Sequence, residues 1–316
     1  MPPAVEPVAG VHVDALLSNL ARLYRPTEFV ADQVIPYIEV VHESDLYPVF
    51  TQGDFYGTDV DDLVGDRSEP RIVDVSHATN RYQTDRRELA WDISDRERKN
   101  ADDQFRLERN KQLATLGRLM LKREIRADAL LKTTANGGQL SLGTTAANAW
   151  SVPTANVEND VIYGREQIRK TIGIRPNTIL IPESVVSDLQ KNTNLITKLQ
   201  YTYGDVNNRP LLEEYYPVLP AVWMGMRTVV NGTIKNTAGE NLTESYSDVW
   251  SRSVRLLFVQ PGPALENPSV AYTFRNEPMT TRRERRERNR TDWFAVGQTI
   301  VEQVVAPNAG FEISSA

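Results

Sequence analysis

The sequence predicts an α+β chain, because one long helix and several strand-like runs follow each other without a repeat. The first observation is residues 100–134, where no proline occurs and apolar residues recur at helical spacing. The second is residues 47–93, a largely polar stretch framed by strand-like runs. The third is a set of β-branched runs that begin at residues 222, 254, 270 and 293. Strands so widely spaced are typical of α+β folds.

Composition limits the possible functions. The chain has 316 residues, of which 40% are hydrophobic and 25% are charged, which is enough apolar material for a substantial core. The net charge of −6 argues against a protein that mainly wraps nucleic acid. The chain has no cysteine, so disulfides, cysteine nucleophiles and thiolate metal sites are excluded. We see no secretion signal, and no apolar run reaches the ~18 residues of a membrane span.

Residues 100–134 would form a helix roughly 50 Å long. We expect Asn100 to cap it and the Gly-Gly pair at 137–138 to end it. The main apolar stripe comprises Phe105, Leu113, Leu116, Met120, Ala127 and Leu131, and a narrower opposite stripe comprises Leu107, Leu121 and Ile125. Two i,i+4 ion pairs, Asp102–Arg106 and Asp128–Lys132, are expected on the solvent sides. This pattern fits either an ordinary core helix or a strut packed on both sides.

Residues 47–93 read as a projecting loop. Strict alternation of Leu89, Trp91 and Ile93 with polar or small residues predicts a half-buried strand where the stretch closes. A compact domain rarely carries so long an irregular excursion, so a two-stranded loop that leaves the body explains it better. An isolated hairpin is marginally stable in water, so the loop would need a surface, such as a neighbouring subunit. A loop folded over its own domain is the alternative.

The remaining segments complete the predicted order. Residues 1–10 read as an extended arm and residues 14–24 as a short helix. Val157–Ile172 is a second amphipathic helix that Gly173 ends. A buried strand then follows the turn at residues 175–177 and leads into a helix at residues 183–191. Residues 231–247 read as a polar surface loop, and a strand-like run, Phe311-Glu-Ile, closes the chain.

Five segments in this order carry a resemblance to a known family. They are Phe29–Pro36, Glu124–Leu131, Gly173–Pro182, Asp248–Ser251 and Val301–Phe311. Their order and spacing over nearly the whole chain resemble the major capsid protein of tailed bacteriophages, whose Hong Kong 97-type fold is shared with encapsulin shells. The resemblance implies an N-terminal arm at 1–45, an extended β-loop at 46–94, a spine helix and connector at 95–149, an axial domain at 150–255, and peripheral-domain return strands at 256–316.

The resemblance also implies a function. The chain would be a structural protein, without enzymatic activity, that self-assembles into hexamers and pentamers of an icosahedral head around double-stranded DNA. Some family members carry an N-terminal scaffolding segment, but only about 40 residues precede the loop here, which implies a separate scaffolding protein or a processed chain. Others weld their shells through a lysine of the extended loop. No lysine occurs between residues 1 and 98, so we expect non-covalent contacts only.

Residue patterns for catalysis or metal binding are not found. His12, His42 and His77 are scattered and lack metal-ligand spacing. Residues 59–66 cluster four carboxylates without the register of a calcium loop, which leaves a solvated loop or weak cation binding between subunits. No phosphate loop, dinucleotide fingerprint or nucleophile elbow is present. We therefore assign no catalytic, metal-binding or cofactor-binding residue.

Two regions are candidates for subunit contacts. Phe55 and Tyr56 lie near the outward end of the loop and would anchor in a neighbour's pocket, or else pack within their own loop. Residues 282–290 carry six arginines and two glutamates, which could be a solvated face, pair with acidic residues of a neighbour such as those at 59–66, or contact DNA. The candidate interface residues are Phe55, Tyr56, Asp61, Asp62, Arg67, Arg282, Arg283, Arg285 and Arg286.

The expected partners follow from the capsid interpretation. They are other copies of the chain, a separate scaffolding protein, a portal, packaged double-stranded DNA held by non-specific contacts, and a decoration protein as an optional partner, with no membrane involved. The expected location is the virion, after assembly in the bacterial host cytoplasm. Two alternatives remain open: an encapsulin-like compartment shell, and a soluble hydrolase with an unrecognised carboxylate site.

Overall fold

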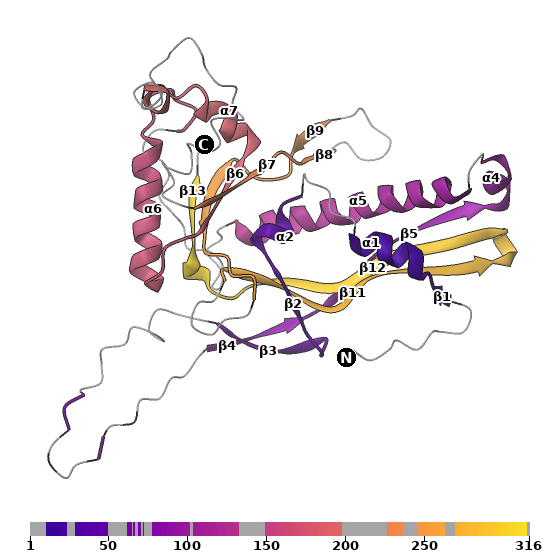
Figure 1. The fold of residues 1–316 in the computed structure, drawn as a ribbon, viewed down its shortest axis with the longest axis horizontal. Coiled ribbons are helices and arrows are strands. Elements are labelled where there is room, and N and C mark those ends of the chain that lie inside the picture. Colours follow the sequence, from indigo (N-terminus) through magenta and orange to yellow (C-terminus); the bar gives the residue numbers. More distant parts are fainter. Residues whose placement is uncertain are drawn as a thin grey trace.

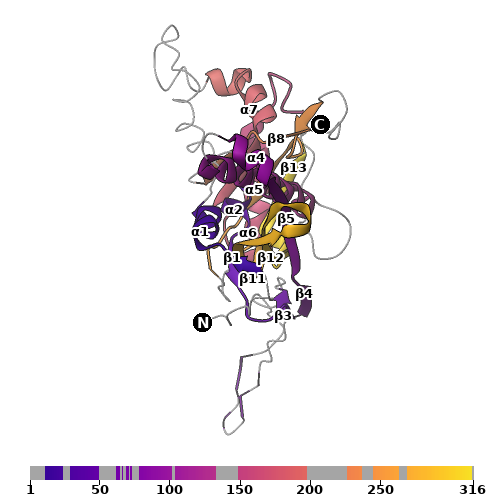
Figure 2. The same cartoon turned by 90° about the vertical axis from the view of Figure 1, so that its right-hand side faces the viewer.

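The structure is a computed structural model that describes most of the chain. The described residues are 11–23, 29–49, 62–64, 66, 69–70, 72, 78–101, 104–132, 149–197, 226–236, 245–262 and 269–314. Two sheets and a long helix dominate these residues (Figure 1). One sheet and the helix extend along the long axis of the molecule, and the second sheet and its helices stand across one end of them (Figure 1). Figure 2 shows helix α7 (Glu183–Leu189) toward the top of the view and strands β3 (Ser44–Val49) and β4 (Ala78–Gln83) toward the bottom.

The larger sheet is built around a long hairpin. Its strands are β1 (Val11–Val13), β2 (Tyr37–Glu39), β5 (Asp85–Ser94), β11 (Ala271–Arg286) and β12 (Thr291–Val304). The order is β1-β11-β12-β5, and β2 pairs in parallel with β11. The hairpin turns through the 3-10 helix η1 (Glu287–Asn289) and Arg290, whose φ of 50° is left-handed. The arginine-rich run therefore forms the end of β11 and its turn.

The long helix α5 (Gln104–Leu131) packs on this sheet and follows the short helix α4 (Asp95–Asn100). The predicted stripe is confirmed at Leu116, Met120, Ala127 and Leu131, which are buried, whereas the side chain of Phe105 lies outside the described residues. The Asn100 cap is wrong: Ser94 caps α4 by accepting a hydrogen bond from Glu97 N (3.1 Å), and the backbone is extended at Ala101.

The opposite stripe of the long helix is only partly covered. Leu107 and Leu121 are half-buried against core clusters, whereas Ile125 is exposed. The Asp128–Lys132 pair exists at 3.2 Å, but its predicted solvent position is wrong because Asp128 is buried. Of the Asp102–Arg106 pair, Asp102 lies outside the described residues. The helix is thus a strut with one fully packed side.

The smaller sheet crosses one end of this unit. Its order is β13-β10-β6-β7, with β13 (Gly310–Ser314), β10 (Ser253–Leu257), β6 (Thr178–Pro182) and β7 (Arg227–Asn231). The helices α6 (Val157–Ile172) and α7 (Glu183–Leu189) pack against it (Figure 1). Gly173, with φ 76°, ends α6 as predicted. Because β13 pairs with β10, this C-terminal strand joins the smaller sheet rather than the sheet of β11 and β12.

Smaller elements complete the fold. The ribbon of β3 (Ser44–Val49) and β4 (Ala78–Gln83) forms one two-stranded sheet, and β8 (Ile234–Asn236) with β9 (Tyr246–Asp248) forms another. The first helices are α1 (Ala15–Leu23) and α2 (Ala31–Val34), and a 3-10 turn, η2 (Pro307–Ala309), precedes β13. Within the described part of the chain, no helix is long and apolar enough to cross a membrane.

Candidate subunit interface

The ribbon β3–β4 is attached to the body by two tyrosines. Tyr82 stacks on Phe274 with ring centroids 4.6 Å apart, and Tyr47 lies 5.4 Å from the same ring. Tyr47 Oη donates to Val304 O (3.4 Å), and Tyr82 Oη donates to His42 O (3.2 Å). Burial raises the pKa of both phenols above the usual tyrosine value, so both remain hydrogen-bond donors at neutral pH. The base of the ribbon is therefore fixed to β11 and β12.

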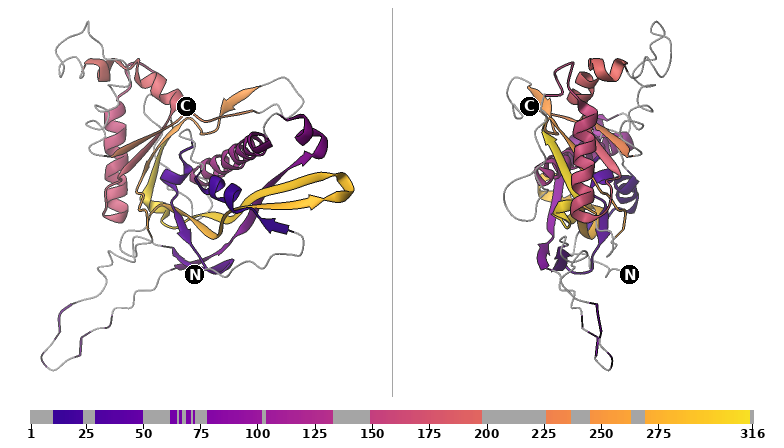
Figure 3. Two further views of the ribbon diagram at one scale, coloured as in Figure 1. Left: turned by 45° about the vertical axis from the view of Figure 1, so that its right-hand side comes forward. Right: turned by 90° about the vertical axis from the view of Figure 1, so that its left-hand side faces the viewer.

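The described residues beyond this base are exposed. Leu63 and Ile72 are 81% and 94% exposed, and Leu46, on β3 in the base itself, is 63% exposed. The described loop residues lie away from both sheets, as Figures 1 and 3 show. Exposed apolar side chains on a projecting segment make this segment a candidate interaction surface.

The sequence predicted a two-stranded loop between the strand-like runs at residue 47 and residues 88–93, and the described residues test part of this prediction. The strand-like run at residue 47 belongs to β3, but its partner is β4, and the run at residues 88–93 pairs with β12 instead. The two-stranded part of the loop therefore closes before residue 85. Of the candidate interface residues, Phe55, Tyr56, Asp61 and Arg67 lie outside the described residues, and Asp62 is exposed.

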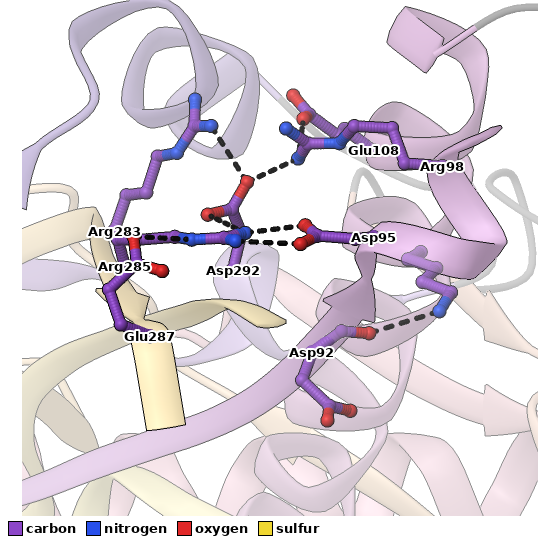
Figure 4. Close-up of polar contacts among 9 residues, drawn as sticks. Asp92, Asp95, Arg98, Glu108, Arg283, Arg285, Glu287 and Asp292 are labelled. Carbon is purple, nitrogen blue, oxygen red and sulfur yellow. Dashed lines mark hydrogen bonds and ion pairs between the residues drawn. The ribbon is translucent and has the colours of Figure 1, made fainter. Parts of the chain in front are cut away.

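The arginine-rich run meets carboxylates of its own chain (Figure 4). Asp292 is buried and accepts hydrogen bonds from Arg283 Nη2 (3.0 Å) and Arg285 Nη1 (3.3 Å), and its carboxylate lies 2.6 Å from Arg98 Nη2. Asp95, in the first turn of α4, receives two hydrogen bonds from Arg285 at 2.6 and 2.8 Å. This cluster ties the end of the β11–β12 hairpin to α4.

The electrostatics of the cluster favour the ionised acids. Burial raises the pKa of Asp292, but the guanidinium groups of Arg98 and Arg283 outweigh it and hold the pKa below the usual aspartate value. The hydrogen bonds from Arg285 lower the pKa of Asp95. The two other candidate arginines have in-chain neighbours as well: Arg282 lies 4.0 Å from Glu88, and Arg286 lies 3.5 Å from Glu284.

Sequence reasoning missed these in-chain acids, although a signal existed. A tight hairpin that turns at residues 287–290 places Arg285 opposite Asp292 in the antiparallel register. Asp95 could not be found in this way, because its position depends on how α4 folds back on the sheet. Lys111 on α5 completes that junction by donating to Asp92 O (3.0 Å) beside Arg98, which pairs with Glu108 at 2.8 Å.

Replacing Asp292 with asparagine should lower the free energy of unfolding by about 1–3 kcal/mol at neutral pH, because three arginines lose a charged acceptor. The pKa of Asp292 is lower in the folded chain than in the unfolded chain, so its contribution is present above the usual aspartate pKa and is lost as pH falls through the folded value. Urea unfolding at pH 7 and pH 3 measures both effects. Asp85→Asn removes an exposed ion pair with Arg87 and should change the free energy of unfolding little. An equal loss of stability in this control would contradict the role given to Asp292.

A second charged cluster is buried where α5 meets both sheets. Arg123 forms an ion pair with Asp32 of α2 and donates to Thr273 Oγ1 (3.2 Å) on β11. Glu124 accepts from Ala31 N (2.7 Å) and from Trp250 Nε1 (2.8 Å). Asp128 accepts from Ser251 N (3.2 Å) and from Arg255 Nη2 (2.9 Å) on β10. One stretch of the long helix thus connects α2 and the larger sheet to the smaller sheet.

Glu124→Gln should change how stability depends on pH. Burial raises the pKa of Glu124 above the usual glutamate value, although the N–H donors of Ala31 and Trp250 partly offset this. A raised folded pKa means that stability is highest below the unfolded pKa and falls as pH rises through the folded value, by up to about 1.4 kcal/mol per pH unit. Urea unfolding between pH 4 and pH 7 should show a smaller decline for the variant. Parallel curves for the two proteins would refute the assignment.

Comparisons with known proteins define the class of this fold. Among the residues that the structure describes, no group of three histidine or acidic side chains is arranged to hold a metal ion. No family model matches the chain. The arrangement of long helix, projecting ribbon and two sheets is the Hong Kong 97-type fold of tailed-phage capsid proteins, as the resemblance in sequence predicted.

Particular relatives span nearly the whole chain. The major capsid protein of Burkholderia phage BcepMu is 26% identical over 275 residues, which cover 84% of each protein. A phage-related protein from Bordetella bronchiseptica RB50 has a similar structure, with a TM-score of 0.74 and 21% identity over 96% of this chain and 97% of that one. The mature capsid of bacteriophage PhiM1 gives a TM-score of 0.57 and 13% identity over 99% of this chain and 92% of that one.

Proposed function

We propose that this chain is a major capsid subunit, which assembles into hexamers and pentamers of an icosahedral phage head around double-stranded DNA. The likeness to a phage major capsid protein over most of both chains supports this role. The observation that carries it is the ribbon, which is anchored at its base and presents exposed apolar side chains beyond it. Exposed apolar side chains on such a segment suit contact with a neighbouring subunit, which a shell requires.

The mechanism is geometric. Each ribbon and loop lies over a neighbouring subunit, and the long helix holds the two sheets in a fixed relation through buried hydrogen bonds and ion pairs. Many modest contacts per subunit add up to a stable shell, because each contact after the first forms between subunits that are already held together. Closed symmetry then limits growth.

The interface residues remain those of the sequence prediction. Phe55 and Tyr56 would anchor the loop, Asp61, Asp62 and Arg67 would surround them, and the arginine-rich run with Arg282, Arg283, Arg285 and Arg286 would form a second contact. The end of this run is exposed at Arg285 and Arg286, which leaves it accessible to another subunit. Its internal ion pairs give the contact a fixed shape.

The proposal extends to partners and location. The subunit has a structural role without enzymatic activity and is part of the virion. It assembles in the bacterial cytoplasm with a separate scaffolding protein and a portal, contacts packaged DNA without sequence preference, and has a decoration protein as an optional partner. Residues 46–94 would be the extended loop, 95–149 the spine helix region, and 150–255 the axial domain.

Electron microscopy of the expressed chain, alone and with its neighbouring gene products, tests this function. Closed angular shells on the order of hundreds of ångströms across would support the proposed function, because many subunits in closed symmetry form particles of that size. Double-stranded DNA inside particles from infected cells would favour a virus over an encapsulin-like compartment, which would hold a cargo enzyme. Small monodisperse particles under all conditions would overturn the proposal and reopen the search for a hydrolase site.

A further inference from the structure

One end of the molecule carries a concentration of exposed cations. It is formed by α4 and by the turn of the β11–β12 hairpin, which lie at the same end of the molecule in Figure 1 and face each other in Figure 4. Its exposed charged residues are Arg96, Lys99, Arg285, Arg286, Glu287, Arg288 and Arg290. Glu287 is the single acid among them, and it already pairs with Arg285 at 3.1 Å. Exposed acids of α4 and the turn therefore do not balance the positive charge of this end.

Most of these cations are not used to hold the fold together. Arg285 binds Asp95. Arg286 lies over the ring of Trp293, 4.6 Å from its centroid, and pairs with Glu284. The other cations have side chains that make no ion pair or hydrogen bond with any residue that the structure describes, and they are Arg96, Lys99, Arg288 and Arg290. We refer to these four residues as the basic end.

The two elements that carry the basic end are fixed to each other. Asp95 N, at the start of α4, donates to Arg290 O (3.1 Å), and the Asp95 carboxylate receives two hydrogen bonds from Arg285. Arg98 of α4 adds an ion pair of 2.6 Å to the buried Asp292 of β12. The backbone that presents the four cations is thus already ordered, so a partner would pay little conformational entropy to bind them.

The chemistry of the basic end fits a polyanion better than another protein surface. No exposed large apolar side chain of the described residues lies on α4 or on the turn, whereas the centre of a protein interface is usually apolar or aromatic. Protein–DNA interfaces are much more positively charged than protein–protein interfaces. The chain as a whole has a net charge of −6, so a polyanion would be attracted to this end and repelled by the rest of the surface.

We propose that the basic end binds the phosphate backbone of the packaged double-stranded DNA. Arg96, Arg288 and Arg290 can each contact a phosphate through two hydrogen bonds, and Lys99 adds a point charge. Such contacts do not read the base sequence. The inference rests on the proposed shell function and names the surface that touches the DNA. Its cations differ from the arginines at 282–286 that are assigned to a subunit contact.

Binding of the unassembled subunit to a short DNA duplex tests the site directly. The variant Arg96→Gln, Lys99→Gln, Arg288→Gln removes three cations and leaves Arg290 in its left-handed turn. Each phosphate contact contributes about 0.9 to the slope of log K against log salt, so the slope should become shallower by about 2–3, and the affinity at low salt should drop about tenfold or more. The loss should be the same for duplexes of different sequence.

A control variant changes the net charge equally at exposed positions elsewhere. It carries Lys122→Gln, Arg175→Gln and Lys191→Gln, and it should bind the duplex like the unmodified chain. Equal losses of affinity in the two variants would show that only net charge matters, and no loss in either would show that the basic end does not touch DNA. Both results would overturn the site.

Lysine labelling of assembled particles distinguishes DNA from a second subunit as the partner. Lys99 should react with an amine reagent in empty shells and be protected severalfold in DNA-filled particles. Protection of Lys99 in empty shells would place the basic end in a subunit interface, and equal reactivity in both particles would show no contact with DNA, so either result would overturn the proposal. Absence of shells in every preparation would contradict the proposed function instead, and the duplex assay would still decide whether the basic end binds DNA.

Discussion

Replacing Asp128 with alanine is expected to lower the free energy of unfolding by about 3–5 kcal/mol, because it leaves a buried arginine without its closest counter-charge. Arg255 is fully buried on β10, and its Nη2 lies 2.9 Å from the Asp128 carboxylate. The next carboxylate, Glu312, is 3.7 Å away. The same substitution removes the acceptor for the backbone N–H of Ser251. Urea unfolding of the unassembled subunit measures the loss.

The control for this prediction lies one helical turn away. Lys132→Ala removes only an exposed partner of Asp128, so it should change the free energy of unfolding by less than about 1 kcal/mol. The guanidinium of Arg255 outweighs burial and lowers the pKa of Asp128, so its stabilising effect should fade as pH drops through that lowered value. Similar losses for both variants would show that Arg255 does not depend on Asp128.

The helical parts of the fold could be predicted because their signals are local. The buried stripe of α5 follows from residue spacing, and the bounds of α6 follow from an apolar stripe and the left-handed Gly173. The Asn100 cap failed because Ser94, six residues earlier, begins a separate short helix. A capping residue can be recognised in a sequence, but two nearby candidates compete on equal terms until the tertiary contacts of α4 are known.

Apart from Asp292, which the hairpin places opposite Arg285, the partners in the charged clusters could not be predicted because they are far away in the sequence. Arg123 interrupts the apolar stripe of α5. Only the folded structure shows that Arg123 forms an ion pair with Asp32 and donates a hydrogen bond to Thr273. The same holds for Glu124 with Trp250. The arginine-rich run was recognised as unusual, yet its own-chain partner Asp95 depends on the packing of α4. Sequence patterns thus indicate that a charge is unusual, while long-range contacts decide what it binds.

Gly297→Ala should be the most disruptive single-methyl change within the larger sheet. A Cβ at this position of β12 would lie 2.6 Å from Arg87 O and 2.9 Å from Glu88 Cα, both backbone atoms of β5. Backbone atoms cannot turn aside as a flexible side chain can, so β5 must move away from β12. Overpacking of this kind costs about 1–3 kcal/mol, and we expect a value near the upper end.

The shift should also reach the ribbon. Thr84 alone separates β4 from β5, so a displaced β5 alters the direction in which the ribbon leaves the body. We therefore expect Gly297→Ala to reduce shell assembly more strongly than its loss of stability in urea would account for. Gly262→Ala is the matched control, because an added Cβ there meets nothing within 4 Å. Normal stability and assembly of Gly297→Ala would mean that the two strands separate without cost, and that the direction of the ribbon is set by Tyr47 and Tyr82 alone.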